Sequence, residues 1–350
     1  MDVKKVGKAI AYLRKRAGYT QKELADRIGV SDKAVSKWER GLGLPEISYL
    51  RKLSILLDTD SDSLLTGDVA HHKNDWIGII FLDENPYGIH AGTMIYDKPL
   101  IYFLLSYFLL VGIKEIYIAC TAVDTHYIER ILGEGTDYGV HITTVNGGLK
   151  DAVDAIPNYS GNVMLVYGRC ILYGVDQTRF LQKAMVDREH LIMLALPKKM
   201  QKTSITVDVD KRVMNDVADD SRKLRTQYDF SKLPILFFPL QILLAIAEAP
   251  SIAAFIEEQI ARESMFVETL DRGFVEIEVD DWNNVQEAST FIKIVQDKCG
   301  MNVYCLEEVA WRRGMISLTK LKELGERKAG TEYGEYVLGL YERMSQKQYT

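Results

Sequence analysis

Apolar residues recur at helical spacing through the first 66 positions, between clear start and stop signals. The periodicity predicts five short helices, over residues 3–16, 21–28, 32–40, 46–57 and 61–66. Thr20 and Glu23 have the spacing of a capping box at the start of the second helix, and Ser31 is placed to cap the third. Five short helices in so short a segment predict a small all-α bundle.

The pattern changes at Trp76, where short apolar runs begin to alternate with helical segments. Buried strands are predicted over residues 77–82, 115–120, 163–167 and 191–196. Helices are predicted over residues 100–111 and 126–132. This alternation indicates an α/β domain with a mainly parallel central sheet. Two longer apolar runs, 100–113 and 233–247, are too short to cross a membrane and are expected to be buried helix or strand.

Polar residues at 67–75 separate the two patterns and predict a linker. We therefore expect a helical domain at 1–66, an α/β domain at 76–295, and a C-terminal helical region at 296–350 that packs on it. The four cysteines form no Cys-x-x-Cys pair, which argues against a disulfide framework or a zinc ribbon. The first residues lack the apolar stretch of a secretory signal, so a cytoplasmic location is expected.

The formal charge of −6 conceals a difference between the two parts of the chain. Residues 1–66 contain 13 basic and nine acidic side chains, and the remainder contains 30 basic and 40 acidic ones. A polyanion such as DNA is attracted to the first part and repelled by most of the second. Any nucleic acid is therefore expected to bind at the N-terminal domain.

The segment Thr20–Gly41, TQKELADRIGVSDKAVSKWERG, places two short helices on either side of a tight turn. Ala25 is small where the helices must cross, and Gly29 stands in the turn, where a positive φ favours glycine. The segment resembles the helix-turn-helix of the Cro/phage-repressor (XRE) family. The likeness covers the whole first domain.

This resemblance implies that residues 32–40 form a recognition helix in the major groove of an operator. It also implies a phosphate contact at the start of the preceding helix, where backbone amides are free. Trp38 has the spacing of a core residue rather than of a base contact. The residues expected to bind double-stranded DNA are Thr20, Gln21, Asp32, Lys33, Ser36, Lys37 and Arg40.

The second domain shares several stretches with one enzyme family. They are residues 95–142, which begin IYDKPLIYFLL, residues 172–176 (LYGVD), residues 285–317, which contain CLEEVAWRRG, and residues 332–340 (EYGEYVLGL). The stretches resemble glucose-1-phosphate thymidylyltransferases, with a divergent middle at about 198–272. The resemblance implies a nucleotidyltransferase-like, Rossmann-like α/β fold with a C-terminal helical tail.

That family joins a sugar 1-phosphate to a nucleoside triphosphate, which requires a glycine-rich loop, a lysine and two carboxylates that hold Mg²⁺. By the resemblance, the lysine position falls at about His90 and the loop is replaced by an acidic stretch beginning at Asp83. The first metal carboxylate falls on Arg169 and the second on Glu278. A guanidinium at the first position repels a divalent cation. We therefore expect a degenerate pocket of His90, Arg169 and Glu278, with no catalytic residue, metal, cofactor or enzymatic activity.

Two interpretations of Arg169 remain open. It forms a salt bridge with Glu278 that stabilises an inactive pocket, or the two residues serve a ligand site in which the guanidinium replaces the metal on a phosphate. In either case an open α/β sheet places its ligand at the carboxyl ends of the strands.

The resemblance also implies a second, regulatory nucleotide site. The residues that match it are Tyr173, Gly174, Val303, Cys305, Glu308, Val309 and Arg312. The alternative is that this segment packs the C-terminal helices or a subunit interface. Glu308 and Arg312 have the i,i+4 spacing of a helix-surface ion pair.

These features together predict a transcriptional regulator whose second domain senses a nucleotide sugar or mediates oligomerisation. An active sugar nucleotidyltransferase with a DNA-binding appendage is the first alternative, and a domain used only for oligomerisation is the second. A homo-oligomer is expected, because one short recognition helix reads too few bases for useful specificity. No membrane association is expected.

Overall fold

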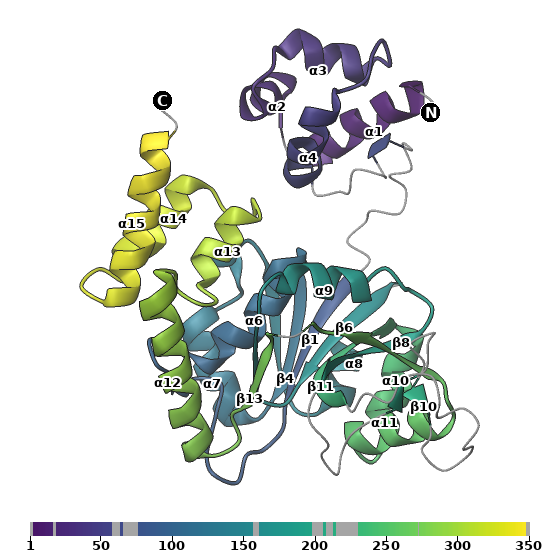
Figure 1. Cartoon of the computed structure of the whole chain (residues 1–350), viewed down its shortest axis with the longest axis vertical. Coiled ribbons are helices and arrows are strands. Elements are labelled where there is room, and N and C mark those ends of the chain that lie inside the picture. Colours follow the sequence, from purple (N-terminus) through teal and green to yellow (C-terminus); the bar gives the residue numbers. More distant parts are fainter. Residues whose placement is uncertain are drawn as a thin grey trace. The chain divides into compact units, whose positions relative to one another are not determined.

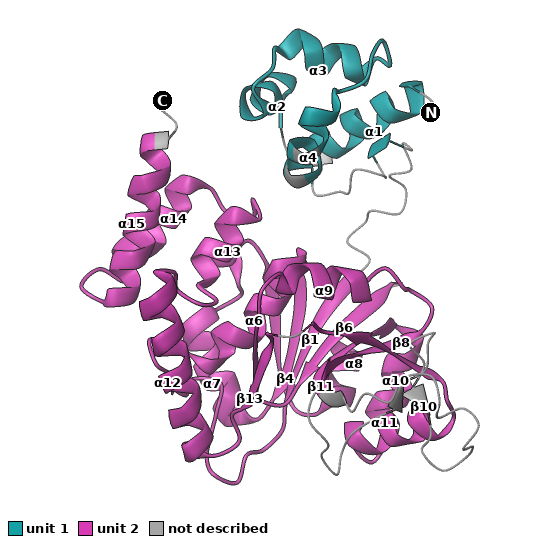
Figure 2. Cartoon of the chain, in the orientation of Figure 1, with its two compact units in different colours: residues 1–75 teal, residues 76–350 magenta. Residues whose placement is uncertain are grey.

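The computed structural model describes residues 3–16, 19–57, 64–65, 76–156, 161–197, 206–207, 213–214, 230–271 and 273–347. The chain divides into two compact units, residues 1–75 and 76–350 (Figure 2). Each unit encloses a core of its own. The linker predicted at 67–75 lies outside the described residues.

The described part of the first unit is helical (Figure 1). Its helices are α1 (Val3–Arg16), α2 (Gln21–Ile28), α3 (Asp32–Glu39) and α4 (Ile47–Leu56). Ile10, Leu24, Val35 and Leu53 bring all four helices into one buried cluster. Most of the predicted helix at 61–66 lies outside the described residues. The all-α character of this unit is confirmed.

A seven-stranded sheet forms the centre of the second unit, in the order β12-β8-β11-β6-β1-β4-β5. The strands are β1 (Trp76–Leu82), β4 (Glu115–Cys120), β5 (His141–Asn146), β6 (Asn162–Tyr167), β8 (Leu191–Pro197), β11 (Phe230–Pro239) and β12 (Met265–Thr269). Neighbouring strands are parallel except at β11, which is antiparallel to both β6 and β8. The predicted mainly parallel α/β sheet is confirmed.

Three small strand pairs accompany this sheet. They are β2 (Met94–Ile95) with β3 (Lys98–Pro99), β7 (Cys170–Tyr173) with β13 (Val275–Glu278), and β9 (Thr206–Val207) with β10 (Val213–Met214). The helices are α6 (Leu100–Val111), α7 (Ala122–Leu132), α8 (Leu149–Ala155), α9 (Gln177–Ala184), α10 (Gln241–Glu248), α11 (Ile252–Ala261), α12 (Trp282–Cys299), α13 (Leu306–Arg312), α14 (Leu318–Arg327) and α15 (Glu332–Lys347). A short 3₁₀ helix spans Thr136–Tyr138.

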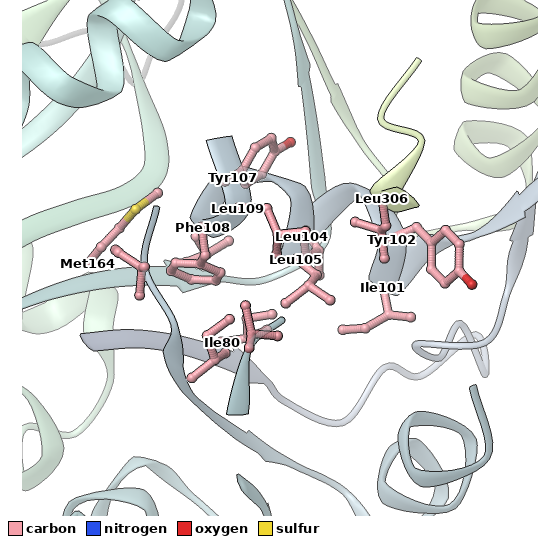
Figure 3. Packing of buried hydrophobic residues seen from close by; sticks show 14 of the residues in the cluster. Ile80, Ile101, Tyr102, Leu104, Leu105, Tyr107, Phe108, Leu109, Met164 and Leu306 are labelled. Atoms are coloured by element: carbon pink, nitrogen blue, oxygen red, sulfur yellow. The ribbon is translucent and has the colours of Figure 1, made fainter. Parts of the chain in front are cut away.

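Helix α6 accounts for the first long apolar run. All its residues from Leu100 to Leu109 are buried, and it belongs to the cluster that covers β1 and β6 (Figure 3). The hydroxyl of Tyr107 donates to the carbonyl oxygen of Cys170 at 3.0 Å and accepts from the backbone N–H of Leu172 at 2.8 Å. Burial of this polar group is therefore compensated by hydrogen bonds. Among the described residues, every helix falls short of the length and apolarity needed to cross a bilayer.

Three boundaries differ from the predictions. Helix α7 begins at Ala122 rather than at His126, because Thr121 caps it by accepting from the backbone N–H of Asp124 at 3.2 Å. The second long apolar run is divided between strand β11 and helix α10. The predicted division between residues 295 and 296 falls inside helix α12.

Candidate functional site

Helices α2 and α3 of the first unit are defined by their caps. The backbone N–H of Glu23 donates to the hydroxyl of Thr20 at 3.1 Å, and the Glu23 carboxylate accepts from the backbone N–H of Thr20 at 2.7 Å. The predicted capping box is therefore present, and its hydrogen bonds lower the pKa of Glu23. Gly29 ends α2 with φ at 88°, which explains the glycine in the turn. Ser31 caps α3 as expected.

The inner face of α3 is fixed by the core. Val35 and Trp38 are buried, and the indole of Trp38 lies 6.2 Å from the ring of Tyr49. The interpretation of Trp38 as a core residue is therefore confirmed.

The outer face of α3 carries the residues expected to contact DNA. Asp32, Lys33, Lys37 and Arg40 are exposed, and Ser36 is half-buried. Arg40 turns back on the helix end, where its Nε donates to the Ser36 carbonyl oxygen at 3.2 Å. The two lysines project one helical turn apart on the exposed face.

A buried ion pair that sequence reasoning missed links α1 to α3. Arg14 contacts both carboxylate oxygens of Glu39, at 2.5 and 3.0 Å, and donates to the carbonyl oxygen of Tyr19 at 2.6 Å. The amide of Gln21 also donates to Glu39, at 2.7 Å. The side chain of Gln21 is thus engaged inside the unit. One signal was present in the sequence: Arg14 lies four residues after Ile10, on the buried face of α1.

In the second unit, polar residues gather where the adjacent parallel strands β6, β1 and β4 end. Asp83 follows β1, Asp124 lies in the first turn of α7 after β4, and Arg169 follows β6. One guanidinium nitrogen of Arg169 is 3.1 Å from the Asp83 carboxylate, and the other donates to the Asp83 carbonyl oxygen at 2.6 Å. The second nitrogen also lies 3.8 Å from the Asp124 carboxylate.

Of the two interpretations of Arg169, the one that pairs it with Glu278 in a salt bridge is wrong. Arg169 pairs with Asp83 and Asp124, whereas Glu278 is exposed on β13, opposite Cys170 in the backbone register. The reason is topological: Asp83 and Asp124 follow the carboxyl ends of two strands next to or near β6, and Arg169 follows the carboxyl end of β6 itself. The single positive charge of this guanidinium can balance only one of the two nearby carboxylates, and it would repel a divalent cation placed beside it.

His90 joins the same cluster. Its ring stacks on Tyr127 with centroids 4.0 Å apart, and its Nδ1 accepts from the backbone N–H of Gly92 at 3.1 Å. Because Nδ1 accepts, the proton of the neutral ring is on Nε2. Burial lowers the pKa of His90; Asp124 opposes this shift and Arg169 adds to it. The structure therefore brings His90 and Arg169 together around Asp124.

Asp124 is the central buried acid of this cluster. Its carboxylate accepts from the backbone N–H of Ala91 at 2.5 Å and from the Thr121 hydroxyl at 2.9 Å, and it is 2% exposed. Sequence reasoning missed Asp124, which lies in the first turn of α7, because this helix was predicted to start later. Tyr127 fell inside the predicted helix, but nothing in the sequence indicated its contact with His90.

The residues expected to form a regulatory site lie around β7 and α13, where they contact other parts of the fold. The Arg312 Nε donates to Glu308 at 2.6 Å, and the Tyr336 hydroxyl donates to the same carboxylate at 2.5 Å. Gly174 packs on the Phe274 ring so closely that a Cβ would lie 2.3 Å from it. Val303 and Cys305 are buried and Val309 is half-buried. Tyr173 stacks edge-on against Phe291, with centroids 5.6 Å apart.

Tyr304 connects the residues around β7 with those of the α13 segment. Its hydroxyl contacts the carbonyl oxygen of Leu172 and the side chain of Gln177. Tyr304 lies between Val303 and Cys305 in the chain, so it joins the α13 segment to β7. No signal in the sequence distinguished it from a core aromatic residue.

Both units are similar to known proteins. A family model described as helix-turn-helix matches residues 10–64. The glucose-1-phosphate thymidylyltransferase of Neisseria meningitidis serogroup A is 29% identical over 262 residues, which cover 71% of this chain and 91% of that enzyme. The enzymes of the same name from Neisseria gonorrhoeae and Mycolicibacterium smegmatis are each 26% identical and cover 70% and 71% of this chain and 90% of their own lengths. A solved Bacillus anthracis structure, provisionally assigned to the same class and complexed with sucrose, has a TM-score of 0.48 at 14% identity and covers 62% of this chain and 94% of its own.

These relatives contradict one prediction. We expected the second unit to be without enzymatic activity, but proteins named for that activity match about 70% of the chain at 26–29% identity. The substitutions at His90 and Arg169 are therefore not sufficient to exclude activity, and the prediction is wrong. The predicted resemblances themselves are confirmed. The chain joins an N-terminal helix-turn-helix domain of the XRE type to a region homologous to glucose-1-phosphate thymidylyltransferases.

Proposed function

We propose that the protein is a sequence-specific DNA-binding regulator of transcription that acts on an operator in the cytoplasm. The observation that carries the proposal is helix α3, whose inner face is locked by Val35, Trp38 and the Glu39 ion pair while Lys33 and Lys37 remain exposed. A rigid helix with an exposed basic face is what insertion into a major groove requires.

The decisive experiment is operator selection. The full-length protein is incubated with sheared genomic DNA, bound fragments are sequenced, and an enriched site is tested by gel shift against a scrambled duplex. A shared motif bound at least about 1,000-fold more tightly than the scrambled duplex supports the proposal. Equal affinity for both duplexes at physiological salt contradicts it.

For the second unit we propose a binding site for the phosphate groups of a nucleotide sugar. Arg169 and His90 support this role. The side chain of Arg169 is 2% exposed, and within the described residues its Nε has no hydrogen-bond partner. His90 adds an Nε2–H donor nearby. Both groups lie at the carboxyl ends of the parallel strands, where open α/β sheets bind ligands.

Thermal unfolding distinguishes ligand binding from a role in oligomerisation alone. A nucleotide sugar at about 100 times its dissociation constant stabilises its binding domain by about 2.7 kcal/mol. We expect dTDP-glucose to raise the unfolding temperature and glucose alone to leave it unchanged. Light scattering of the same samples measures the oligomer. A homo-oligomer without ligand stabilisation supports the oligomerisation role instead.

A second candidate function is sugar nucleotidyl transfer, which the enzymes from Neisseria favour through their names and coverage. With Arg169 at the strand ends, the guanidinium would itself have to offset part of the triphosphate charge. Pyrophosphate release from dTTP and glucose 1-phosphate tests this function. Turnover that is lost in Arg169→Gln, with the fold retained, would establish it.

A further inference from the structure

Asp83 contacts the guanidinium of Arg169, to which the proposed phosphate ligand would have to bind. Its carboxylate lies 3.1 Å from one terminal nitrogen of Arg169, and its carbonyl oxygen accepts from the other at 2.6 Å. These two contacts use both terminal nitrogens of a side chain whose Nε is buried without a hydrogen-bond partner in the described part of the chain. One carboxylate oxygen of Asp83 therefore binds a guanidinium nitrogen to which an anionic ligand could bind instead.

The two partners of this ion pair differ greatly in exposure. The side chain of Arg169 is 2% exposed, whereas that of Asp83 is 68% exposed. Asp124, the other acid near the guanidinium, is 2% exposed and is held by Ala91 and Thr121. Asp83 is therefore the partner that can turn away from Arg169 and remain hydrated, whereas Asp124 is buried and held by its hydrogen bonds.

The loop that carries Asp83 has a separate attachment. Asn85 donates to the carbonyl oxygen of Asp280 at 2.9 Å, and the indole N–H of Trp282 donates to the carbonyl oxygen of Tyr87 at 3.1 Å. These bonds fasten the loop to the start of α12. Release of the Asp83 carboxylate therefore does not require the loop to leave the sheet.

We propose that Asp83 is a built-in competitor for the anion site of Arg169, which a phosphate-bearing ligand must displace. The inference rests on the proposed phosphate site and adds its regulation. In the free protein Asp83 neutralises Arg169 and holds the start of the loop. A bound phosphate takes over the contact with the guanidinium and frees the Asp83 carboxylate, so ligand binding is converted into a change at the start of the loop.

The charges around the site explain why such a competitor matters. Asp280 lies close enough for Asp83 to raise its pKa and for Arg169 to lower it, although burial is the largest cause of the net upward shift. Glu84 and Asp281 add further acid nearby. A phosphate therefore enters a negative environment and depends on direct bonds to Arg169. Removal of the competing carboxylate should consequently strengthen phosphate binding.

The test compares Asp83→Asn with Glu84→Gln in the full-length protein. Each substitution removes one negative charge from an exposed position of the same loop, but only the first removes the carboxylate that contacts Arg169. Binding of inorganic pyrophosphate and of dTDP-glucose is measured by calorimetry at 0.15 M salt. Asp83→Asn is expected to tighten binding roughly tenfold, the effect of losing one charge-assisted hydrogen bond. Glu84→Gln is expected to change it by about twofold or less, because exposed charges are screened.

Hydrogen exchange supplies an independent measurement. Pyrophosphate is expected to speed exchange at residues 83 and 84 of the wild-type protein and to have little effect there in Asp83→Asn. The amides of Tyr87 and Ile89, which donate to Asn85, are expected to exchange at unchanged rates in both proteins. Equal tightening in both variants, or none in Asp83→Asn, overturns the inference while the phosphate site stands. Absence of binding to every form overturns the phosphate site as well. Gel shifts of the same samples show whether the DNA-binding proposal is affected.

Discussion

Arg14 of helix α1 and Glu39 of helix α3 form a two-bond ion pair in which both side chains are about nine-tenths buried, at 10% and 7% exposure. The pair attaches the end of the proposed recognition helix to the rest of the first unit. Glu39 also accepts from Gln21 at the start of α2, so one carboxylate holds three helices together.

Removal of one member of this pair is expected to leave a buried charge without its partner. Arg14→Ala should destabilise the first unit by about 3 kcal/mol. This loss of stability should appear as roughly 100-fold faster hydrogen exchange in peptides from α1 and α3. The double variant Arg14→Leu with Glu39→Leu should lose less stability, because no charge stays unpaired. A single variant that exchanges at the wild-type rate would contradict the prediction.

Lys33→Ala with Lys37→Ala is expected to remove specific DNA binding. Both side chains are exposed, so the fold should be unchanged, and specific affinity should fall roughly 100-fold. The matched control is Lys8→Ala with Lys15→Ala on α1, which removes the same charge from two other exposed positions. Gel shifts and circular dichroism are recorded for both. Similar losses in the two variants would show that the exposed face of α3 has no special role.

The stability of the second unit should depend on the protonation of His90. Its pKa in the folded protein lies below the ordinary value of 6.5, so the unfolded chain binds the proton more readily. The stabilisation is therefore present above pH of about 6.5 and is lost as pH falls through the lowered pKa. Thermal unfolding between pH 7 and pH 5 should show a decline in wild type that His90→Gln reduces. His126→Gln, at an exposed position of α7, should keep the wild-type profile.

Thiol labelling should distinguish one cysteine from the other three. Cys299 is exposed, whereas Cys120, Cys170 and Cys305 are buried. Burial raises the pKa of Cys120 to about 11 and that of Cys305 well above its ordinary value, so few of these thiols ionise at neutral pH. The native protein should react rapidly with one equivalent of Ellman's reagent and the urea-unfolded protein with four. Rapid labelling that persists in Cys299→Ser would contradict this assignment.

The regular elements were predictable because their signals are local. Helix α6 and strand β4 have the predicted bounds, since each depends on hydrophobic periodicity within its own segment. Helix α2 likewise follows from its capping residues. The start of α7 was missed because its cap, Thr121, directly follows a strand and no apolar periodicity marks the first turn.

The contacts within the strand-end cluster were not predictable in the same way. Arg169 was singled out, but its partners Asp83 and Asp124 follow two other strands and meet it only through the order β6-β1-β4. Nothing in the local sequence favours Asp83 over Glu278 as the partner. Such pairings depend on topology, which periodicity alone does not specify.

The C-terminal helices share the core of the α/β unit. Leu321, Tyr333 and Val337 belong to the same buried cluster as Ile80 of strand β1 and Leu104 of helix α6. Buried Glu307 of α13 also accepts from Lys328 and from the Tyr333 hydroxyl, both at 2.5 Å. A chain shortened at residue 295 would therefore lose part of its interior as well as its last helices. Efforts to isolate the second unit for crystallisation or ligand screening should retain residues 76–347 as one piece.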